Sequence, residues 1–170
     1  MKIAIIGYGK MGKAVESSAL SQQLEVSQII TSLAQLQSAT FANDEVAIEF
    51  TNSNNFLENI RVLSSKNVKI VSGTTGWDNN FKEVQQIIEN SNSSFLFSSN
   101  FSIGIYAFWQ AVQVLAQIFN DHEEYDVMIQ EWHHALKKDS PSGTAIKTAE
   151  LIMDKLKRKT KILGKRRRQT

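Results

Sequence analysis

The stretch that decides the fold is KIAIIGYGKMGKAVESSAL, residues 2–20 of a 170-residue chain. Its β-branched run KIAII predicts a short buried strand, and the apolar spacing after the glycines predicts a helix over 13–23. Between them, Gly7, Gly9 and Gly12 form a GxGxxG turn. In this strand–turn–helix context the spacing favours dinucleotide binding, because glycines let the backbone approach a pyrophosphate at a helix N-terminus. The alternative is an ordinary strand-to-helix turn.

The chain beyond this turn alternates strands with helices. Further strands are expected at 24–30, 45–50, 67–72 and 94–97, with helices at 54–65 and from an Asp78 cap through 88. This rhythm predicts an α/β fold, an N-terminal Rossmann-type doubly wound parallel sheet.

The alternation of strands and helices ends near Asn100. A long apolar helix over 103–119 is followed by an expected strand over 125–132 and a helix over 142–156. We therefore expect a dinucleotide-binding domain over 1–101 and an incomplete α+β substrate and oligomerisation domain over 102–170. Trp132 is expected in the core of that second domain.

Composition narrows the functional classes. The chain contains no cysteine, which excludes disulfides and thiolate chemistry and argues against zinc. No apolar run reaches membrane-spanning length, and the opening residues do not resemble a signal peptide. These features predict a cytoplasmic protein without a membrane partner.

The charge is distributed unevenly. Residues 155–170 hold nine of the nineteen Lys and Arg residues and no acidic residue, although the net charge of the chain is only +2. Such a tail is either a solvated end or an arm for nucleic acid. Because aromatic side chains that could stack on bases are missing from it, we expect no nucleic-acid partner.

Small and hydroxyl-bearing residues follow several predicted strands, where ligands of open α/β sheets bind. They also serve as helix caps, which is the alternative interpretation. The acidic residue that usually holds the adenosine ribose is missing after the second strand, where Thr31 and Ser32 stand instead. Both can hydrogen-bond a 2′-hydroxyl or a 2′-phosphate, so the choice between NADH and NADPH stays open.

A second chemical cluster lies in EWHHALKKDSPSGTA, residues 131–145. His133 and His134 follow the expected strand, and Lys137 lies four residues after His133. Histidine exchanges protons near neutral pH, lysine donates a proton or binds a carboxylate, and the amides of SPSGTA can hold an anion. The cluster predicts a site for a dianionic acid. Adjacent histidines on a strand point to opposite faces, so one of them can equally be structural or exposed.

Taken together, the motifs GYGKMG, EFT, SGTTGW, SSNFSIG and E-x-HH-x-x-K-x-D-x-PSGTA resemble those of the 4-hydroxy-tetrahydrodipicolinate reductase (dihydrodipicolinate reductase) family of bacterial lysine and diaminopimelate biosynthesis. The resemblance covers residues 1 to about 154. The motifs occur in the family's order, and the last is highly specific.

The resemblance implies that NADH or NADPH gives a hydride to a cyclic unsaturated dicarboxylate, while a neighbouring carbon gains a proton. It implies a proton donor/acceptor role for His133, a proton-donor role for Lys137, and substrate contacts for His134, Gly143 and Thr144. It also implies a homotetramer. The implied cofactor contacts are Gly7, Tyr8, Gly9, Lys10, Met11, Gly12, Gly73, Thr74, Thr75, Ser98, Ser99, Asn100 and Phe101.

The sequence departs from the family pattern in two ways. The ribose-binding acid is missing, and the chain ends soon after the PSGTA helix, where the family continues through a mixed sheet that builds the tetramer. We therefore expect a truncated or frameshifted chain whose unpaired strand promotes irregular self-association. A non-catalytic nucleotide-binding remnant is the alternative to an active reductase.

Overall fold

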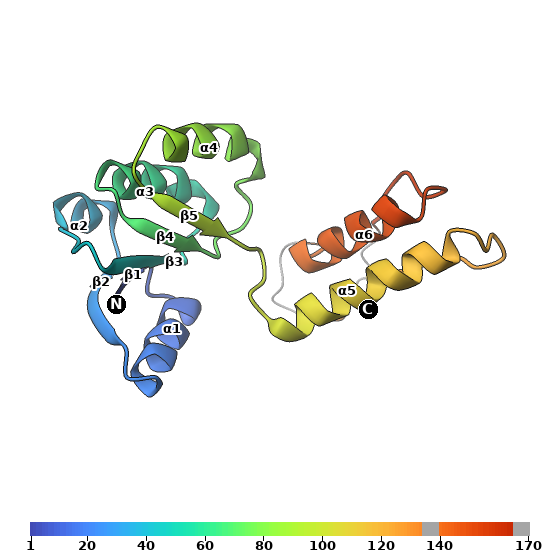
Figure 1. Ribbon diagram of the computed structural model, residues 1–170, viewed down its shortest axis with the longest axis horizontal. Helices are drawn as coiled ribbons and strands as arrows, with labels where there is room; N and C mark the ends of the chain where they lie inside the picture. The colour runs from blue at the N-terminus through green and yellow to red at the C-terminus, as the bar shows by residue number, and fades with distance from the viewer. Residues whose placement is uncertain (134–139, 165–170) are drawn as a thin grey trace, which may run out of the picture. The chain divides into compact units, whose positions relative to one another are not determined.

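The computed structural model describes residues 1–133 and 140–164. The chain divides into an N-terminal unit, residues 1–99, and a C-terminal unit, residues 100–170. Figure 1 shows both units with their helices and strands.

The N-terminal unit is built on a five-stranded sheet in the order β2-β1-β3-β4-β5, in which every pairing is parallel. The predicted Rossmann-type sheet is thus confirmed. The chain places β2 on one side of β1 and β3 on the other, and this reversal of strand order creates a switch point at the carboxyl ends of β1 and β3. The strands are β1 (Lys2–Ile6), β2 (Glu25–Ile30), β3 (Glu45–Glu49), β4 (Lys69–Ser72) and β5 (Ser94–Phe97).

Helices cover both faces of this sheet (Figure 1). One face of β1 packs Ile3 and Ile5 against α1, and the other packs Ala4 and Ile6 into the larger core formed with α2, α3 and α4. This central strand is buried on both sides, as its uninterrupted apolar sequence requires. The helices are α1 (Lys10–Ser21), α2 (Leu33–Ser38), α3 (Ser53–Ser65) and α4 (Phe81–Glu89).

The starts of α1 and α4 differ from the predictions, and helix α2 was not predicted. α1 begins at Lys10, immediately after its N-cap Gly9, because Lys10, Met11 and Gly12 lie in its first turn. Asp78 does not cap α4 but starts a 3₁₀ turn, η1 (Asp78–Asn80), that precedes it. Helix α2 is short. The sequence feature that indicates its start is the Ser32-x-x-Gln35 cap, in which the Ser32 hydroxyl accepts from the Gln35 backbone amide.

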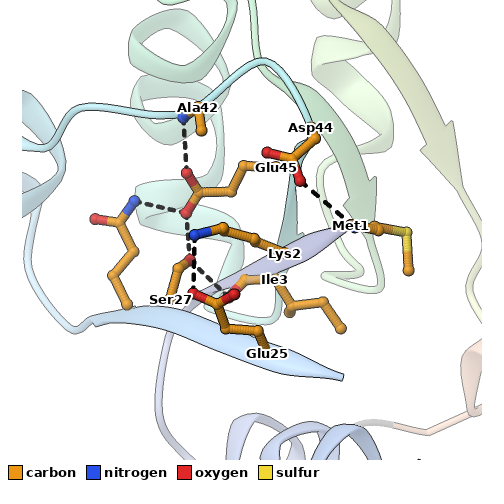
Figure 2. Close-up of polar contacts among 9 residues, drawn as sticks. Met1, Lys2, Ile3, Glu25, Ser27, Ala42, Asp44 and Glu45 are labelled. Carbon is orange, nitrogen blue, oxygen red and sulfur yellow. Dashed lines mark hydrogen bonds and ion pairs between the residues drawn. The ribbon is translucent and has the colours of Figure 1, made fainter. Parts of the chain in front are cut away.

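A buried carboxylate secures the amino ends of the strands (Figure 2). The register between β1 and β2 shifts at Ser27, and the Ser27 hydroxyl donates to the Glu45 carboxylate and to the Ile3 carbonyl. The Gln28 amide and the Ala42 backbone N–H donate to Glu45 as well, at 2.8 and 2.9 Å. Burial raises the pKa of Glu45, but the hydrogen bonds from Ser27, Gln28 and Ala42 outweigh it and hold the pKa below its usual value. The carboxylate thus fixes the bulge that brings Ile30 into the core.

The C-terminal unit consists of two packed helices, α5 (Ile103–Phe119) and α6 (Gly143–Lys155), with connecting segments. Among its described residues, the buried apolar ones are Ala116, Ile152 and Leu156. The Trp109 indole N–H also donates to the Thr148 hydroxyl at 3.0 Å, which links the two helices.

The predicted strand over 125–132 is wrong, because these residues form no ladder in the part of the chain that the structure describes. A β-strand needs a hydrogen-bonded partner, and the described part of the C-terminal unit offers none. The prediction for Trp132 also fails, since this residue is 77% exposed rather than part of the core.

Part of the basic tail is structural rather than solvated. The Arg158 guanidinium donates to the carbonyls of Phe119, Asn120, His122 and Tyr125, at 2.7–3.2 Å. The last carbonyls of a helix have no partner within the helix, so Arg158 satisfies the end of α5 and the turn that follows. The Lys159 ammonium pairs with Asp126 at 2.6 Å.

Candidate functional site

The turn between β1 and α1 uses its three glycines differently. Gly7 has a φ of +91°, and a Cβ on Gly12 would lie 2.2 Å from the Gly7 carbonyl oxygen, so both positions require glycine for the backbone to fold. A Cβ on Gly9, in contrast, would meet nothing within 4 Å. Gly9 is exposed and stands at the N-cap of α1, where backbone N–H groups have no partner within the helix. Open backbone at a helix N-terminus suits an anionic ligand.

A cavity of about 130 Å³ adjoins this turn at the switch point of the sheet. The carboxyl ends of β1, β2 and β3 and the first turns of α3 supply its walls. Its lining residues include Gly7, Thr31, Ser32, Thr51, Asn54 and Glu58. The arrangement provides a small recess with polar and apolar lining residues beside the glycine turn.

Thr31 and Ser32, the two residues that replace the usual ribose-binding acid, are both held by Gln35. The Gln35 side-chain oxygen accepts from the Thr31 amide at 2.8 Å and from the Thr31 hydroxyl at 3.0 Å. The Ser32 hydroxyl accepts from the Gln35 amide. Ser32 therefore caps α2, whereas Thr31 is held at the strand end by the Gln35 side chain, and its hydroxyl has only acceptor capacity left for a ligand.

Glu49 ties two loops of the site together. Its fully buried carboxylate accepts from the Thr51 amide at 3.1 Å, the Thr74 hydroxyl at 2.9 Å and the Ser72 hydroxyl at 2.5 Å. The Thr51 hydroxyl also donates to it. A buried carboxylate with this many donors is stably accommodated, and it locks the EFT loop to the GTTG loop.

The predicted cofactor residues of the GTTG loop separate into two kinds. Thr74 is buried, and its hydroxyl both donates to Glu49 and accepts from the Thr51 amide, so its side chain supports the loop. Thr75 is exposed and stands beside it. A Cβ on Gly73 would lie 2.0 Å from the Phe50 ring, so this glycine is needed for close packing of the two loops.

The remaining residues of the glycine turn lie at its surface. The Tyr8 hydroxyl donates to Glu16 of α1, and this hydrogen bond raises the pKa of Tyr8. Lys13 stacks its ammonium over the Tyr8 ring at 5.8 Å from the centroid. Lys10 and Met11 are exposed on the first turn of α1.

The SSNF segment spans the boundary between the two units. In the N-terminal unit, the Ser98 amide donates to the Ser72 carbonyl at 3.3 Å, which continues the β4–β5 pairing, and Ser99 is exposed. In the C-terminal unit, the Asn100 side chain accepts from the Ser102 amide at 2.8 Å, and Phe101 is exposed.

The C-terminal unit brings together a second cluster, at the start of α6. The Glu131 carboxylate accepts from the Ser142 amide at 2.9 Å and from the Ser142 hydroxyl, and it lies 2.8 Å from Nε2 of His133. Burial raises the pKa of Glu131, but the bonds from Ser142 and His133 outweigh it and lower this pKa to about 2. Glu131 is thus ionised at neutral pH. It takes up the Ser142 amide, whereas Gly143 and Thr144 follow in the first turn of α6.

Two predicted site residues, His134 and Lys137, lie outside the described residues. Among the described residues, no group of three His, Cys, Asp or Glu side chains could hold a metal ion. None of the described helices is long and apolar enough to cross a membrane.

Sequence reasoning missed Glu49 and Glu131 as members of these sites. Both had a signal. Glu49 ends an apolar strand whose carboxyl end faces the cavity, and Glu131 begins the E-x-HH motif. A carboxylate at the end of a buried strand requires hydrogen-bond donors around it. Such a residue therefore predicts a hydrogen-bond network.

Comparisons with known proteins agree with this geometry. A family model described as "Dihydrodipicolinate reductase, N-terminus" matches residues 1–101, and one described as "Dihydrodipicolinate reductase, C-terminus" matches residues 104–169. The second match extends beyond residue 154, where the resemblance seen in the sequence ends.

Similar curated proteins carry the name 4-hydroxy-tetrahydrodipicolinate reductase. One from Christiangramia forsetii is 34% identical over 91% of this chain, and one from Archaeoglobus fulgidus is 32% identical over 89% of it. The chain spans 64% and 65% of the length of these two relatives. A dipicolinate-bound dihydrodipicolinate reductase from a Paenisporosarcina species matches the whole chain and 72% of its own length, with a TM-score of 0.70 and 22% identity, which supports the fold.

Proposed function

Because this chain belongs to the dihydrodipicolinate reductase family, we propose that it supplies the nucleotide site and part of the substrate site of an NAD(P)H-dependent reductase acting on 4-hydroxy-tetrahydrodipicolinate. The observation that carries the proposal is the open backbone of Gly9 at the N-terminus of α1, beside the cavity at the switch point. The reaction belongs to lysine and diaminopimelate biosynthesis.

The residues of the N-terminal unit fit a dinucleotide. The turn from Gly7 to Gly12 would hold the pyrophosphate, because its backbone N–H groups are accessible at Gly9. Thr75, Ser98 and Ser99 would contact the nicotinamide end. Glu49 holds the loop of Thr75 in place through the Thr74 hydroxyl. A bound nicotinamide supplies a hydride to the unsaturated ring of the substrate.

In the C-terminal unit, we assign proton transfer to His133 and Lys137, and contacts with the substrate carboxylates to His134, Gly143 and Thr144. An imidazole can give a proton near neutral pH, and amides at the start of α6 can bind a carboxylate. In an active reductase, His133→Gln and Lys137→Ala should lower kcat about a hundredfold and leave cofactor affinity intact. Near-normal turnover by both variants would remove this assignment.

The glycine turn offers a direct test of nucleotide binding. We expect Gly9→Ala to fold normally, since its Cβ meets open space, but to weaken NADH binding at least about tenfold because the methyl group would stand where a pyrophosphate approaches. Gly12→Ala is the contrasting variant, because its Cβ would clash with the Gly7 carbonyl and lower the melting temperature. Tryptophan fluorescence titration and thermal melting measure the two effects. Unchanged NADH affinity in Gly9→Ala would contradict the proposal.

We further propose that the site prefers NADH to NADPH. Among the described residues that line the cavity none is cationic, while Glu58 is acidic. The Thr31 hydroxyl gives its hydrogen to Gln35, so it can accept from a ribose 2′-hydroxyl but cannot donate to a 2′-phosphate. We expect NADPH to bind about tenfold more weakly than NADH, and Thr31→Arg to reverse this order. Equal affinities in the unaltered chain would contradict the preference.

A non-catalytic nucleotide-binding chain is the second candidate, because the open glycine turn and the cavity serve cofactor binding by themselves. Cofactor binding without turnover of the cyclic diacid would support this candidate. For an active enzyme we propose a cytoplasmic location and a homotetramer. Light scattering of the purified protein tests the oligomeric state.

A further inference from the structure

Glu131 and His133 are joined by a contact that the proposed chemistry does not yet use. Oε2 of Glu131 lies 2.8 Å from Nε2 of His133. The same carboxylate is fixed from the other side by the amide and hydroxyl of Ser142, at the N-cap of α6. The imidazole is therefore attached through Glu131 to the helix that begins the proposed substrate site.

The contact determines which ring nitrogen carries hydrogen. An ionised carboxylate can only accept hydrogen bonds, and Glu131 is ionised at neutral pH. Nε2 of His133 must then be the donor. In the neutral ring the other nitrogen, Nδ1, is unprotonated, so Nδ1 is the atom that gains and loses a proton.

We propose that Glu131 is a positioning residue that holds the Nε2–H of His133, so that the proton exchanged with the substrate passes through Nδ1. The inference rests on the proposed reductase function for its catalytic consequence. In the step, once the substrate ring has lost its 4-hydroxyl group as water, a hydride adds to one carbon of the resulting double bond and the imidazolium gives its Nδ1 proton to the neighbouring carbon, so the neutral ring keeps its hydrogen on Nε2. A hydronium ion or a buffer acid then returns a proton to Nδ1.

The hydrogen bond itself can be tested on the whole chain by NMR with ¹⁵N-labelled histidine. We expect a slowly exchanging ring N–H signal from Nε2 of His133, identified by its loss in His133→Gln. The signal should disappear in Glu131→Ala. It should persist in Glu124→Gln, a matched control that changes a carboxylate 3.4 Å from Nδ1 of His122 in the same unit. Persistence in Glu131→Ala, or a neutral ring protonated on Nδ1, would overturn the inference.

Because Glu131 also holds the first turn of α6, its alanine variant can lose structure there. Glu131→Gln provides the second measurement, since a glutamine of the same size can still accept from Ser142. An amide group can accept from or donate to an imidazole, so we expect this variant to populate both ring tautomers. A ring that keeps hydrogen only on Nε2 in Glu131→Gln would show that the negative charge does not set the tautomer.

The catalytic consequence is tested by a double-mutant cycle. We expect Glu131→Gln to lower kcat about tenfold to a hundredfold with the affinity for NADH unchanged, and to lower it less than about twofold in a His133→Gln background. Equal losses in both backgrounds would indicate that Glu131 only supports structure, and would overturn the positioning role. An unaltered chain without turnover would refute the reductase proposal, while the NMR measurements would still decide the hydrogen bond.

Discussion

The two units of this chain bury their apolar residues to very different extents. In the N-terminal unit, β1 is covered on both faces and a core of large side chains such as Phe56, Ile60 and Leu63 is fully buried. In the C-terminal unit, α5 is almost entirely apolar, yet Ile103, Tyr106 and Ile118 are more than half exposed. Two helices can bury only the stripe along which they touch, whereas a sheet between helix layers buries both of its faces.

The same contrast applies to the carboxylates. Glu45 and Glu49 of the N-terminal unit are buried, and each is surrounded by at least three donors. Glu131 of the C-terminal unit remains partly exposed and depends on Ser142 and His133. A polar network is therefore part of the core in one unit, and part of the surface in the other. The difference indicates that stability is concentrated in the N-terminal unit.

The largest difference between the two units should appear when one phenylalanine ring is removed from each. Phe56 is fully buried and stacks on Trp77 with ring centroids 4.4 Å apart, so Phe56→Ala should cost about 3–5 kcal/mol of the free energy of unfolding. Phe108 is 49% exposed, and Phe108→Ala should cost about 0.5 kcal/mol or less. Denaturant unfolding followed by Trp77 fluorescence, with the other two tryptophans replaced by phenylalanine, measures the first cost. Circular dichroism measures the second. Similar costs would remove the contrast between the units.

An intermediate effect is expected at the end of α5. Arg158→Ala removes donors from four carbonyls and should destabilise the C-terminal unit by about 1–2 kcal/mol, with loss of helical signal. Lys161→Ala, at an exposed position in the same basic tail, is the matched control and should be nearly neutral. Thermal unfolding monitored by circular dichroism compares the two. Equal and negligible effects would restore the interpretation of the tail as a solvated end.

The smallest effect concerns acid. The pKa of Glu131 in the folded chain is about 2, below its ordinary value of 4.5, so its stabilising contribution is complete above pH 4.5 and is lost as the pH falls through 2. The melting temperature of the C-terminal unit should fall over this window, by an amount limited by solvent screening. Glu131→Gln should have a lower melting temperature at neutral pH and less dependence on acid. An identical acid profile in both proteins would contradict the assigned interaction.

Much of the N-terminal unit could be predicted because its signals are local. The run KIAII, the GxGxxG spacing and the stripe of Phe56, Ile60 and Leu63 each reflect a period or a turn within a few residues. The bounds of β5 and α5 agreed with the predictions for the same reason. Helix α2 was missed because six residues are too few to show a helical period, although its Ser32 cap is visible in the sequence.

The expected strand over 125–132 failed because alternation of apolar residues describes a strand only where a partner strand exists. The role of Arg158 could not be predicted either, since its four carbonyl partners lie 33 to 39 residues earlier in the chain. For the candidate site, the sequence identified His133 and the glycine turn, but it did not reveal that Glu131 contacts both His133 and Ser142.

By itself, then, the amino-acid sequence determined the parallel sheet, the glycine turn at its first strand, and the types of residue available for proton transfer and anion binding. These depend on periodicity, on the absence of a side chain, and on side-chain chemistry, all of which are properties of short segments. Only the tertiary structure decided which glycine leaves open backbone, which threonine supports a loop through Glu49, and which nitrogen of His133 faces a carboxylate. Those outcomes depend on contacts between residues far apart in the chain, because a buried or charged group is satisfied by whichever partner the fold brings within hydrogen-bonding distance.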